Sequence, residues 1–286
     1  MLSFKDLLTK VVKGIRYRYS KYLVRPIFCH CFNPLYTLYF NFVFFSFKQA
    51  LRMPVFVYGW PKLFSQFGTF ECEGICRAGM LRLNISSSEA PQYSNGNSEL
   101  LIYGRVVLKD FKVDDVCEIG SGCRINVLPN SEMIIRGNTK IANSCNITVY
   151  SRLYIGAVSR IAHRCQILDS NYHYIADFTR GVVKRLATPI TIGDYCWICN
   201  STTITGGSVI PNRTIVSSNS LVNKDFSSTP EGSIIGGVPA KLITTGLYRV
   251  ENEAFEKKIN DFFHANPYET IFIMDKDITS EICDVH

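Results

Sequence analysis

The chain has 286 residues, of which 47% are hydrophobic and 19% are charged, and its formal net charge is +7. This composition is ordinary for a soluble globular protein of one large or two small domains. It does not fit a nucleic-acid-binding protein, because the positive charge is concentrated near the start and no basic-aromatic stripe follows it.

The eleven cysteines are expected to be reduced. They are scattered through core-like positions, and the opening segment MLSFKDLLTKVVKG lacks the uninterrupted apolar core of a secretion signal. Small buried thiols without a disulfide framework are typical of a chain in a reducing compartment. We therefore expect a cytoplasmic protein.

Residues 4–25 interleave basic and apolar side chains and predict a basic amphipathic helix. One interpretation is a surface helix that contacts anionic lipid, or a lipid-linked acidic acceptor, at the inner face of the membrane. The other is a solvated helix whose apolar stripe packs on its own domain. The sequence leaves both interpretations open.

Residues 35–47, LYTLYFNFVFFSF, form the most apolar stretch of the chain. A transmembrane helix needs roughly 20 apolar residues, and this stretch is shorter and is interrupted by Asn41. It predicts a buried or interfacial element instead. Together with the basic helix it defines an N-terminal basic and aromatic helical segment, residues 1–65.

Residues 66–245 are dense in strand and turn residues, and beyond about residue 115 they carry a repeat of six residues, which neither a helix nor a flat strand requires. A chain coiled as a three-sided prism does require it, because each side must send one aliphatic side chain into the axis. The repeat therefore predicts a mainly β solenoid, the hexapeptide parallel β-helix. Its best-phased residues are Ile192, Ile198, Ile204, Ile210, Val216 and Val222. The portion before the repeat is poorly phased and is interpreted as irregular opening coils.

Two further segments flank or interrupt the repeat. Residues 168–191 carry no hexapeptide pattern, so we expect a protruding loop, which in a compact repeat scaffold is usually functional. Residues 246–286 are charged again, and the run RVENEAFEKKINDFFHANP predicts a helix that ends before Pro267 and caps the open end of the solenoid.

The run ITIGDYCWICNSTTITGGSVIPNRTIVSSNSLVNKD, followed by IIGGVPAKLI, resembles the hexapeptide-repeat acyltransferases. The similarity is closest to the galactoside, maltose and capsular-polysaccharide O-acetyltransferases. This resemblance implies a left-handed parallel β-helix. It also implies a homotrimer in which neighbouring subunits share each active site. The chain departs from the family in often lacking glycine after the aliphatic residue.

Transfer of an acetyl group to a sugar hydroxyl requires a base to take the hydroxyl proton, and a neutral histidine suits this role. Only His163 and His173 fall within the solenoid region. The resemblance implies that His173, in the protruding loop, is the catalytic base, and His163 is interpreted as a structural residue. Asp169 either orients the His173 imidazole or forms the turn at which the loop departs.

The resemblance also implies residues for the two substrates. Asn143 is a candidate for binding the acceptor, with Asn146 as an equal alternative. A binding site for acetyl-CoA needs a slot for the pantetheine arm and cations for the phosphates. Gly236 and Gly237 would let the backbone approach closely. The candidate cofactor residues are Trp197, Asn200, Ser218, Asn223, Lys224 and Lys241.

No metal is expected at this site. The metal-dependent chemistry known for such prisms needs three converging histidines, whereas only His163 and His173 are available in the solenoid region.

The sequence thus predicts an acetyl-CoA-dependent O-acetyltransferase that acts on a sugar hydroxyl of a surface polysaccharide, meaning capsule, O-antigen or a lipid-linked precursor. One alternative is an N-acetyltransferase acting on a nucleotide-linked amino sugar, or a serine acetyltransferase. The other is a non-catalytic β-helix that serves as a spacer or binding module, although such a module needs neither a histidine loop nor the GGVPAK ending.

Overall fold

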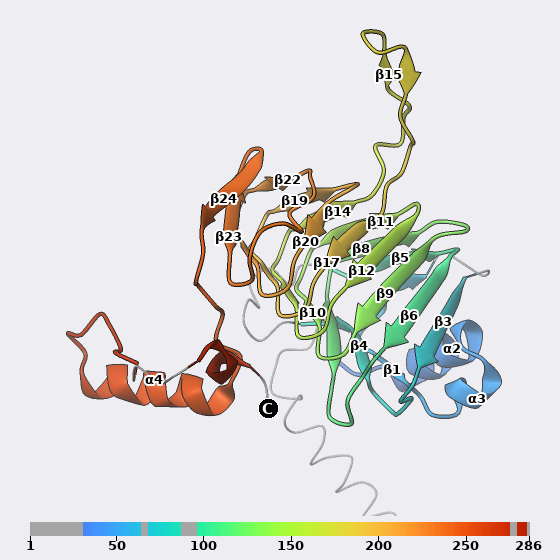
Figure 1. Ribbon diagram of the computed structural model, residues 1–286. Coiled ribbons are helices and arrows are strands. Elements are labelled where there is room, and N and C mark those ends of the chain that lie inside the picture. The colour runs from blue at the N-terminus through green and yellow to red at the C-terminus, as the bar shows by residue number, and fades with distance from the viewer. Residues whose placement is uncertain (1–30, 64–67, 87–95, 275–278, 285–286) are drawn as a thin grey trace, which may run out of the picture.

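The structure is a computed structural model that describes residues 31–63, 68–86, 96–274 and 279–284. The basic helix predicted over residues 4–25 lies outside the described residues. The described chain forms a prism with three sheets as its sides (Figure 1). We call them sheets I, II and III, in the order in which the chain visits them.

The strands of each sheet follow one another along the prism. Sheet I contains β1 (Val55–Val57), β4 (Leu81–Ile85), β7 (Cys117–Gly120), β10 (Lys140–Ile141), β13 (Arg160–Ile161), β18 (Trp197–Ile198), β21 (Ile215–Val216), β23 (Ile234–Gly237) and β24 (Ala240–Thr244). Sheet II contains β2 (Lys62–Leu63), β5 (Glu99–Ile102), β8 (Arg124–Val127), β11 (Asn146–Val149), β14 (Gln166–Leu168), β19 (Thr203–Thr205) and β22 (Leu221–Val222). Sheet III contains β3 (Thr69–Glu73), β6 (Arg105–Lys109), β9 (Glu132–Arg136), β12 (Arg152–Ile155), β17 (Ile190–Ile192) and β20 (Val209–Ile210).

Each circuit of the three sheets makes one coil. The chain completes six coils, from β1, β2 and β3 to β18, β19 and β20, and then begins another with β21 and β22. The coils pair in parallel, and only β23 and β24 pair antiparallel within the three sheets. The predicted mainly β, parallel β-helix is therefore confirmed. It starts at Val55, earlier than the predicted boundary at residue 66, because Pro54 and Pro61, which read as breakers in the sequence, directly precede the short strands β1 and β2.

The interior of the prism is filled by stacked aliphatic side chains. The six residues predicted to point into the axis are all fully buried, and they pair in register between coils: Ile192, Ile198, Ile204, Ile210, Val216 and Val222. Full burial of one such side chain is worth about 1.5–3 kcal/mol. β-branched residues also suit a pleated strand, so the repeat stabilises the fold at every coil.

The turns from sheet I to sheet II use a left-handed backbone residue in successive coils. Gly122 has φ 69°, and the equivalent residues of later coils are Ser144, Arg164, Ser201 and Asn219, with φ of 60°, 61°, 58° and 57°. A non-glycine residue in this region costs on the order of 1–2 kcal/mol. The corners are therefore as tight as glycine corners although the family's glycine is often missing.

Helix α2 (Pro34–Phe44) covers the first coil, beside β1 (Figure 1). The Asn41 side chain donates from Nδ2 to the carbonyl of Val55 at 2.7 Å and accepts from its N–H at 3.1 Å. Thr37 Oγ1 accepts from the N–H of Val57 at 2.9 Å. Because an uncovered strand edge exposes unpaired backbone groups, these two side chains replace a missing neighbouring strand.

Helix α3 (Phe47–Ala50) follows α2 directly. Within the described ranges, no helix is long and apolar enough to cross a membrane. The apolar stretch of residues 35–47 thus forms a short helix on the first coil, with one side buried and the other exposed.

The other end of the prism is closed by β24, which folds back on β23. The predicted C-terminal helix is present as α4 (Glu253–Ala265), and Figure 1 shows it beside the prism. A 3-10 helix, η2 (Ser280–Cys283), follows it. Ion pairs attach this region to the coils, including one between Arg160 and Glu251 at 3.0 Å.

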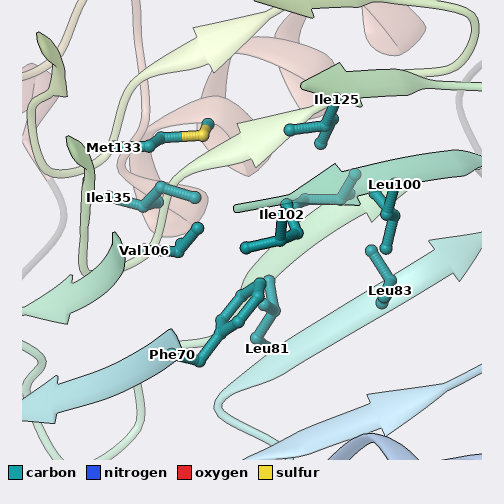
Figure 2. Close-up of a pocket in the computed structure, with 10 residues that line it drawn as sticks. Phe70, Leu81, Leu83, Leu100, Ile102, Val106, Ile125, Met133 and Ile135 are labelled. Carbon is teal, nitrogen blue, oxygen red and sulfur yellow. The ribbon is translucent and has the colours of Figure 1, made fainter. Parts of the chain in front are cut away.

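An interior pocket lies within the first coils (Figure 2). Its lining is wholly apolar and comes from β3 to β9: Phe70, Leu81, Leu83, Leu100, Ile102, Val106, Ile119, Ile125, Met133 and Ile135. No polar group is present there to hold a sugar or a charged intermediate. We therefore assign this space to core packing and not to catalysis.

Candidate active site

One corner of the prism brings together several residues that the sequence assigned to catalysis or binding. The register of sheet I aligns Ile119, Ile141, Ile161, Ile198 and Val216 in successive coils. The residues two positions further along therefore form one column at the turn into sheet II, which we call the corner column: Ser121, Asn143, His163, Asn200 and Ser218. Successive members lie one coil apart, about 4.8 Å along the prism.

Hydrogen bonds connect the members of the corner column. Asn143 is fully buried, and its Oδ1 accepts from the N–H of Ser121 at 3.2 Å. Ser218 Oγ donates to Asn200 Oδ1 at 2.7 Å. These bonds fix two pairs within the column. Ser121 and Asn143 are fully buried, so the part of the column that is open to a ligand consists of His163, Asn200 and Ser218.

His163 lies in this column between Asn143 and Asn200. Burial, with a smaller contribution from Arg164, lowers the pKa of His163. The imidazole is thus held neutral near pH 7, as a proton acceptor must be. From the sequence alone, we interpret His163 as a structural residue. Its place beside the binding candidates follows from the strand pairing of Ile161 with Ile141 and Ile198, which the six-residue period does not give because these residues are 20 and 37 positions apart.

Asp169 stands where the protruding loop leaves the prism. Its Oδ1 accepts from the N–H of Tyr150 and its Oδ2 from the N–H of Ser151, both at 2.7 Å. In an earlier coil the corresponding amide, that of Leu128, bonds instead to the carbonyl of Val149. The Asp169 carboxylate therefore accepts the hydrogen bond that a backbone carbonyl of the next coil would accept if the chain did not leave the prism here. Burial raises the pKa of Asp169, and the two amides act against this shift.

A loop protrudes here, and it spans residues 169–189, slightly fewer than the predicted 168–191, because Leu168 ends β14 and Ile190 begins β17. It leaves after β14, narrows at a bridge between Ser170 and Ala187, and returns at β17. Beyond the bridge, β15 (Ala176–Asp177) and β16 (Val182–Val183) form a small antiparallel hairpin. Figure 1 shows this hairpin standing well clear of the prism. We call residues 171–186 the arm.

His173 lies in the arm, between the bridge and the hairpin, and is exposed. Its neighbour Tyr172 has φ 62° and packs edge-on against Tyr150 at 5.3 Å between ring centroids. Within the described part of the chain, the His173 imidazole forms no hydrogen bond or ion pair. The contacts of Asp169 therefore match its turn-forming role, while the role of orienting His173 stays a prediction.

Trp197 lies on the outer side of sheet I and is 38% exposed. The guanidinium of Arg249 lies over its ring, 5.5 Å from the centroid. The segment after β24 thus runs across this side of the prism. Arg249 had no motif in the sequence that could have indicated its position, because the contact depends on how this segment folds back.

The remaining cofactor candidates lie apart. Asn223 and Lys224 are exposed at the turn after β22, where Lys224 Nζ lies 4.9 Å from the centre of the Phe226 ring. Lys241 is exposed on β24. Gly237 has φ 101° and donates its N–H to Ser220 Oγ at 3.0 Å, so its glycine character serves the local turn.

The candidate site is therefore divided between two corners of the prism. The corner column lies between sheets I and II, whereas the arm with His173 leaves between sheets II and III. The width of sheet II, about 13 Å for a strand of four residues, separates the two corners. Within a single chain, His173 and Asn143 lie at opposite margins of that sheet.

The described residues contain no group of three or more His, Cys, Asp and Glu side chains that could hold a metal ion. The corner column offers imidazole, amide and hydroxyl groups, and the arm adds the His173 imidazole, the Asp177 carboxylate and the cations Arg180, Lys184 and Arg185.

The parallel β-helix agrees with the resemblance of the sequence to the hexapeptide-repeat acyltransferases. No family model matches the chain. It is 27% identical over 146 residues to WbbJ of Escherichia coli (strain K12), named as an O-acetyl transferase of lipopolysaccharide biosynthesis, covering 48% of this chain and 72% of the relative. It is 30% identical over 114 residues to WcaF of the same organism, named as an acetyltransferase of colanic acid biosynthesis, covering 40% and 57%.

Among solved structures, the chain is similar to a hexapeptide-repeat acetyltransferase from Vibrio cholerae O1 biovar eltor in complex with acetyl coenzyme A. The identity is 20%, the coverage is 49% of this chain and 70% of that chain, and the TM-score is 0.31. The two sequence relatives confirm the resemblance seen in the sequence, and the chain is an acyltransferase.

Proposed function

We propose that the protein is an acetyl-CoA-dependent O-acetyltransferase that acts on a sugar hydroxyl of a surface polysaccharide, meaning capsule, O-antigen or a lipid-linked precursor. The observation that carries this proposal is the corner column, in which Asn143, His163, Asn200 and Ser218 lie one coil apart. The names of the relatives, from lipopolysaccharide and colanic acid biosynthesis, support a polysaccharide acceptor.

The active enzyme is a homotrimer in this proposal. The division of the candidate site between two corners supports it, because His173 of one chain can reach a corner column only on a neighbouring chain. The arm is exposed and projects away from its own prism, as an element that crosses to a neighbour must (Figure 1). A heterologous contact repeated around a threefold axis closes the ring.

In the proposed mechanism, His173 accepts the proton of the acceptor hydroxyl while that oxygen attacks the thioester carbonyl. The carbon–oxygen bond forms, the carbon–sulfur bond breaks, and the imidazolium returns its proton to the leaving thiolate. No acyl-enzyme intermediate is formed. Asn143, or equally Asn146, binds the acceptor sugar.

Acetyl-CoA would lie along the prism, held by Asn200 and Ser218 of the corner column. Lys241 would meet the phosphates of the nucleotide, since an exposed ammonium suits such a charge. Asn223 and Lys224, with Trp197 on sheet I, complete the proposed cofactor residues. We propose no metal in the reaction.

His163 is the second candidate for the catalytic base. Its position in the corner column, between two binding candidates, favours it. Its burial opposes it, because a lowered pKa makes the imidazole a weaker base.

A cytoplasmic location agrees with the chemistry of the thiols. All ten cysteines in the described ranges are free, and eight of them are buried. The membrane contact considered for residues 4–25 concerns a segment outside the described residues.

The decisive experiment measures thiol release from acetyl-CoA with purified protein and a panel of acceptors. The panel contains capsular and O-antigen oligosaccharides, a nucleotide-linked amino sugar and free serine. We expect release with an oligosaccharide and a product that mild alkali cleaves, as it cleaves an ester. An alkali-stable amide would support an N-acetyltransferase, and no release with any acceptor would support a spacer or binding module.

A further inference from the structure

The outer side of the N-terminal helices is an apolar surface that faces away from the prism. Its large side chains are between 41% and 72% exposed. We call this set the outer face: Leu35, Leu38, Tyr39, Phe42, Val43, Phe47, Leu51 and Trp60. A contiguous exposed surface of this kind on a soluble protein usually marks an interaction site.

The outer face is continuous because of the spacing of its residues. Positions 35, 38, 39, 42 and 43 fall on one side of α2, following the helical period. Ring contacts extend it at both ends. The Tyr36 ring lies 5.8 Å from that of Tyr39 and 5.6 Å from that of Trp60, and the rings of Phe42 and Phe47 lie 6.0 Å apart.

The opposite side of α2 already has a partner. Phe40 and Phe44 are buried against Phe70 of β3, with ring centroids 5.0 and 5.7 Å apart. The helix is therefore apolar on both sides although only one side packs on the prism. The outer face serves no packing purpose within the described chain.

The segment that carries the outer face is rich in positive charge, although one of its cations, Lys62, is paired with Glu99 at 3.0 Å. Residues 31–63 contain Lys48, Arg52 and Lys62 and no acidic residue. The first 63 residues hold ten of the 31 Lys and Arg residues but one of the 24 Asp and Glu residues. The rest of the chain, with 21 basic and 23 acidic residues, is slightly negative. Three of these ten cations belong to residues 31–63, which carry the outer face, and the other seven precede them in the sequence.

We propose that the outer face docks on a lipid bilayer that contains anionic lipid. Apolar and aromatic side chains enter the boundary between headgroups and acyl chains, while the flanking cations meet anionic headgroups. Helix α2 is about 16 Å long, too short to span a bilayer, so it lies in the interface. Tyr39 and Trp60 are the residue types that favour this depth. The inference is independent of the reaction assigned above.

Charge also argues against a second copy as the occupant. A twofold contact between two outer faces would bring Lys48, Arg52 and their counterparts together, and residues 31–63 offer no carboxylate to pair with them. An anionic surface supplies the opposite charge without such repulsion.

The test uses the full-length protein and sedimentation with vesicles of phosphatidylcholine alone or mixed with phosphatidylglycerol. We expect binding to the mixed vesicles, weakened by salt, and a partition coefficient at least tenfold lower for Leu38→Glu and for Phe42→Glu. Ile271→Glu is the matched control, because Ile271 is also exposed and the added charge is the same. Equal melting temperatures verify that the exposed substitutions leave the fold intact.

Tryptophan fluorescence reports how deeply the outer face enters the bilayer. The chain has two tryptophans, and the mixed vesicles should shift the emission to shorter wavelength in the wild type but not in Trp60→Phe. The proposal is overturned if the wild type does not sediment with mixed vesicles, or if Leu38→Glu sediments as well as Ile271→Glu. It is also overturned if Leu38→Glu instead dissociates an oligomer that the wild type forms without lipid.

Discussion

The carboxylate of Asp169 takes the place of a backbone carbonyl for Tyr150. Where the chain leaves the prism, the Tyr150 N–H would lose its partner in the next coil, and Asp169 Oδ1 accepts it at 2.7 Å. The loop can therefore depart without leaving a buried amide unpaired, which would cost about 1–3 kcal/mol. The arm can leave the prism at this point because the Asp169 carboxylate replaces the missing backbone carbonyl.

Asp169→Asn should lower the free energy of unfolding by about 1–3 kcal/mol. The new amide can still accept from one backbone N–H, but its NH2 group faces the other donor. Denaturant unfolding measures the loss, with His173→Ala as the control that should unfold like the wild type. Unchanged stability combined with a slower reaction would instead support the role of orienting His173.

His173→Ala should lower the acetylation rate by about 10²- to 10⁴-fold, the usual contribution of a positioned base. Binding of acetyl-CoA should change little, because the imidazole meets the reacting atoms. His264→Ala, an exposed histidine of α4, is the matched control. If His173→Ala keeps wild-type activity while His163→Ala does not, the base is His163.

The shared site predicts complementation between two inactive variants. His173→Ala and Asn143→Ala chains, unfolded and refolded together, should regain activity in about a quarter of the sites, because random ring assembly sometimes pairs an intact histidine with an intact asparagine. Each variant treated alone is the control. A mixture no more active than its components, from trimers of normal melting temperature, would contradict the exchange of arms.

Lys241→Ala should raise the Michaelis constant for acetyl-CoA and leave turnover nearly unchanged. A contact with a remote phosphate stabilises the ground and transition states alike. Lys257→Ala, an exposed lysine of α4, is the matched control. A lower turnover at saturating acetyl-CoA would place Lys241 near the reacting atoms.

Ile204→Asp should prevent folding, since it buries an unpaired carboxylate inside the prism, at a cost of several kcal/mol. Thr203→Asp places the same charge one residue earlier, on the outer side of β19, and should stay soluble. Soluble expression and circular dichroism compare the two. A folded Ile204→Asp protein would mean that the side chain can leave the axis.

The axis residues could be predicted because Ile204 and its equivalents repeat within the chain at a period that only a prism satisfies. The alignment of His163 with Asn143 did not follow from that period, because Ile141 and Ile161 stand 20 residues apart and only the strand pairing places them in register. The role of Asn41 could not be predicted either. In the sequence it interrupts an apolar stretch, and its value becomes visible only when Val55, fourteen residues away, lies beside it. Long-range hydrogen bonds of this kind produce no repeat in the sequence and cannot be predicted from one. The same holds for the path of the arm and for the contact between Arg249 and Trp197.

A stack of parallel coils is in principle open-ended, since the last strand of one molecule can pair with the first strand of the next. The Asn41 and Thr37 contacts with β1 remove this possibility at the N-terminal end, where a helix now occupies the place of an incoming strand. The prism therefore cannot lengthen from that end into a fibre. Loss of the Asn41 amide would reopen the edge, and the consequence would be polymerisation of folded molecules even where the fold itself survives.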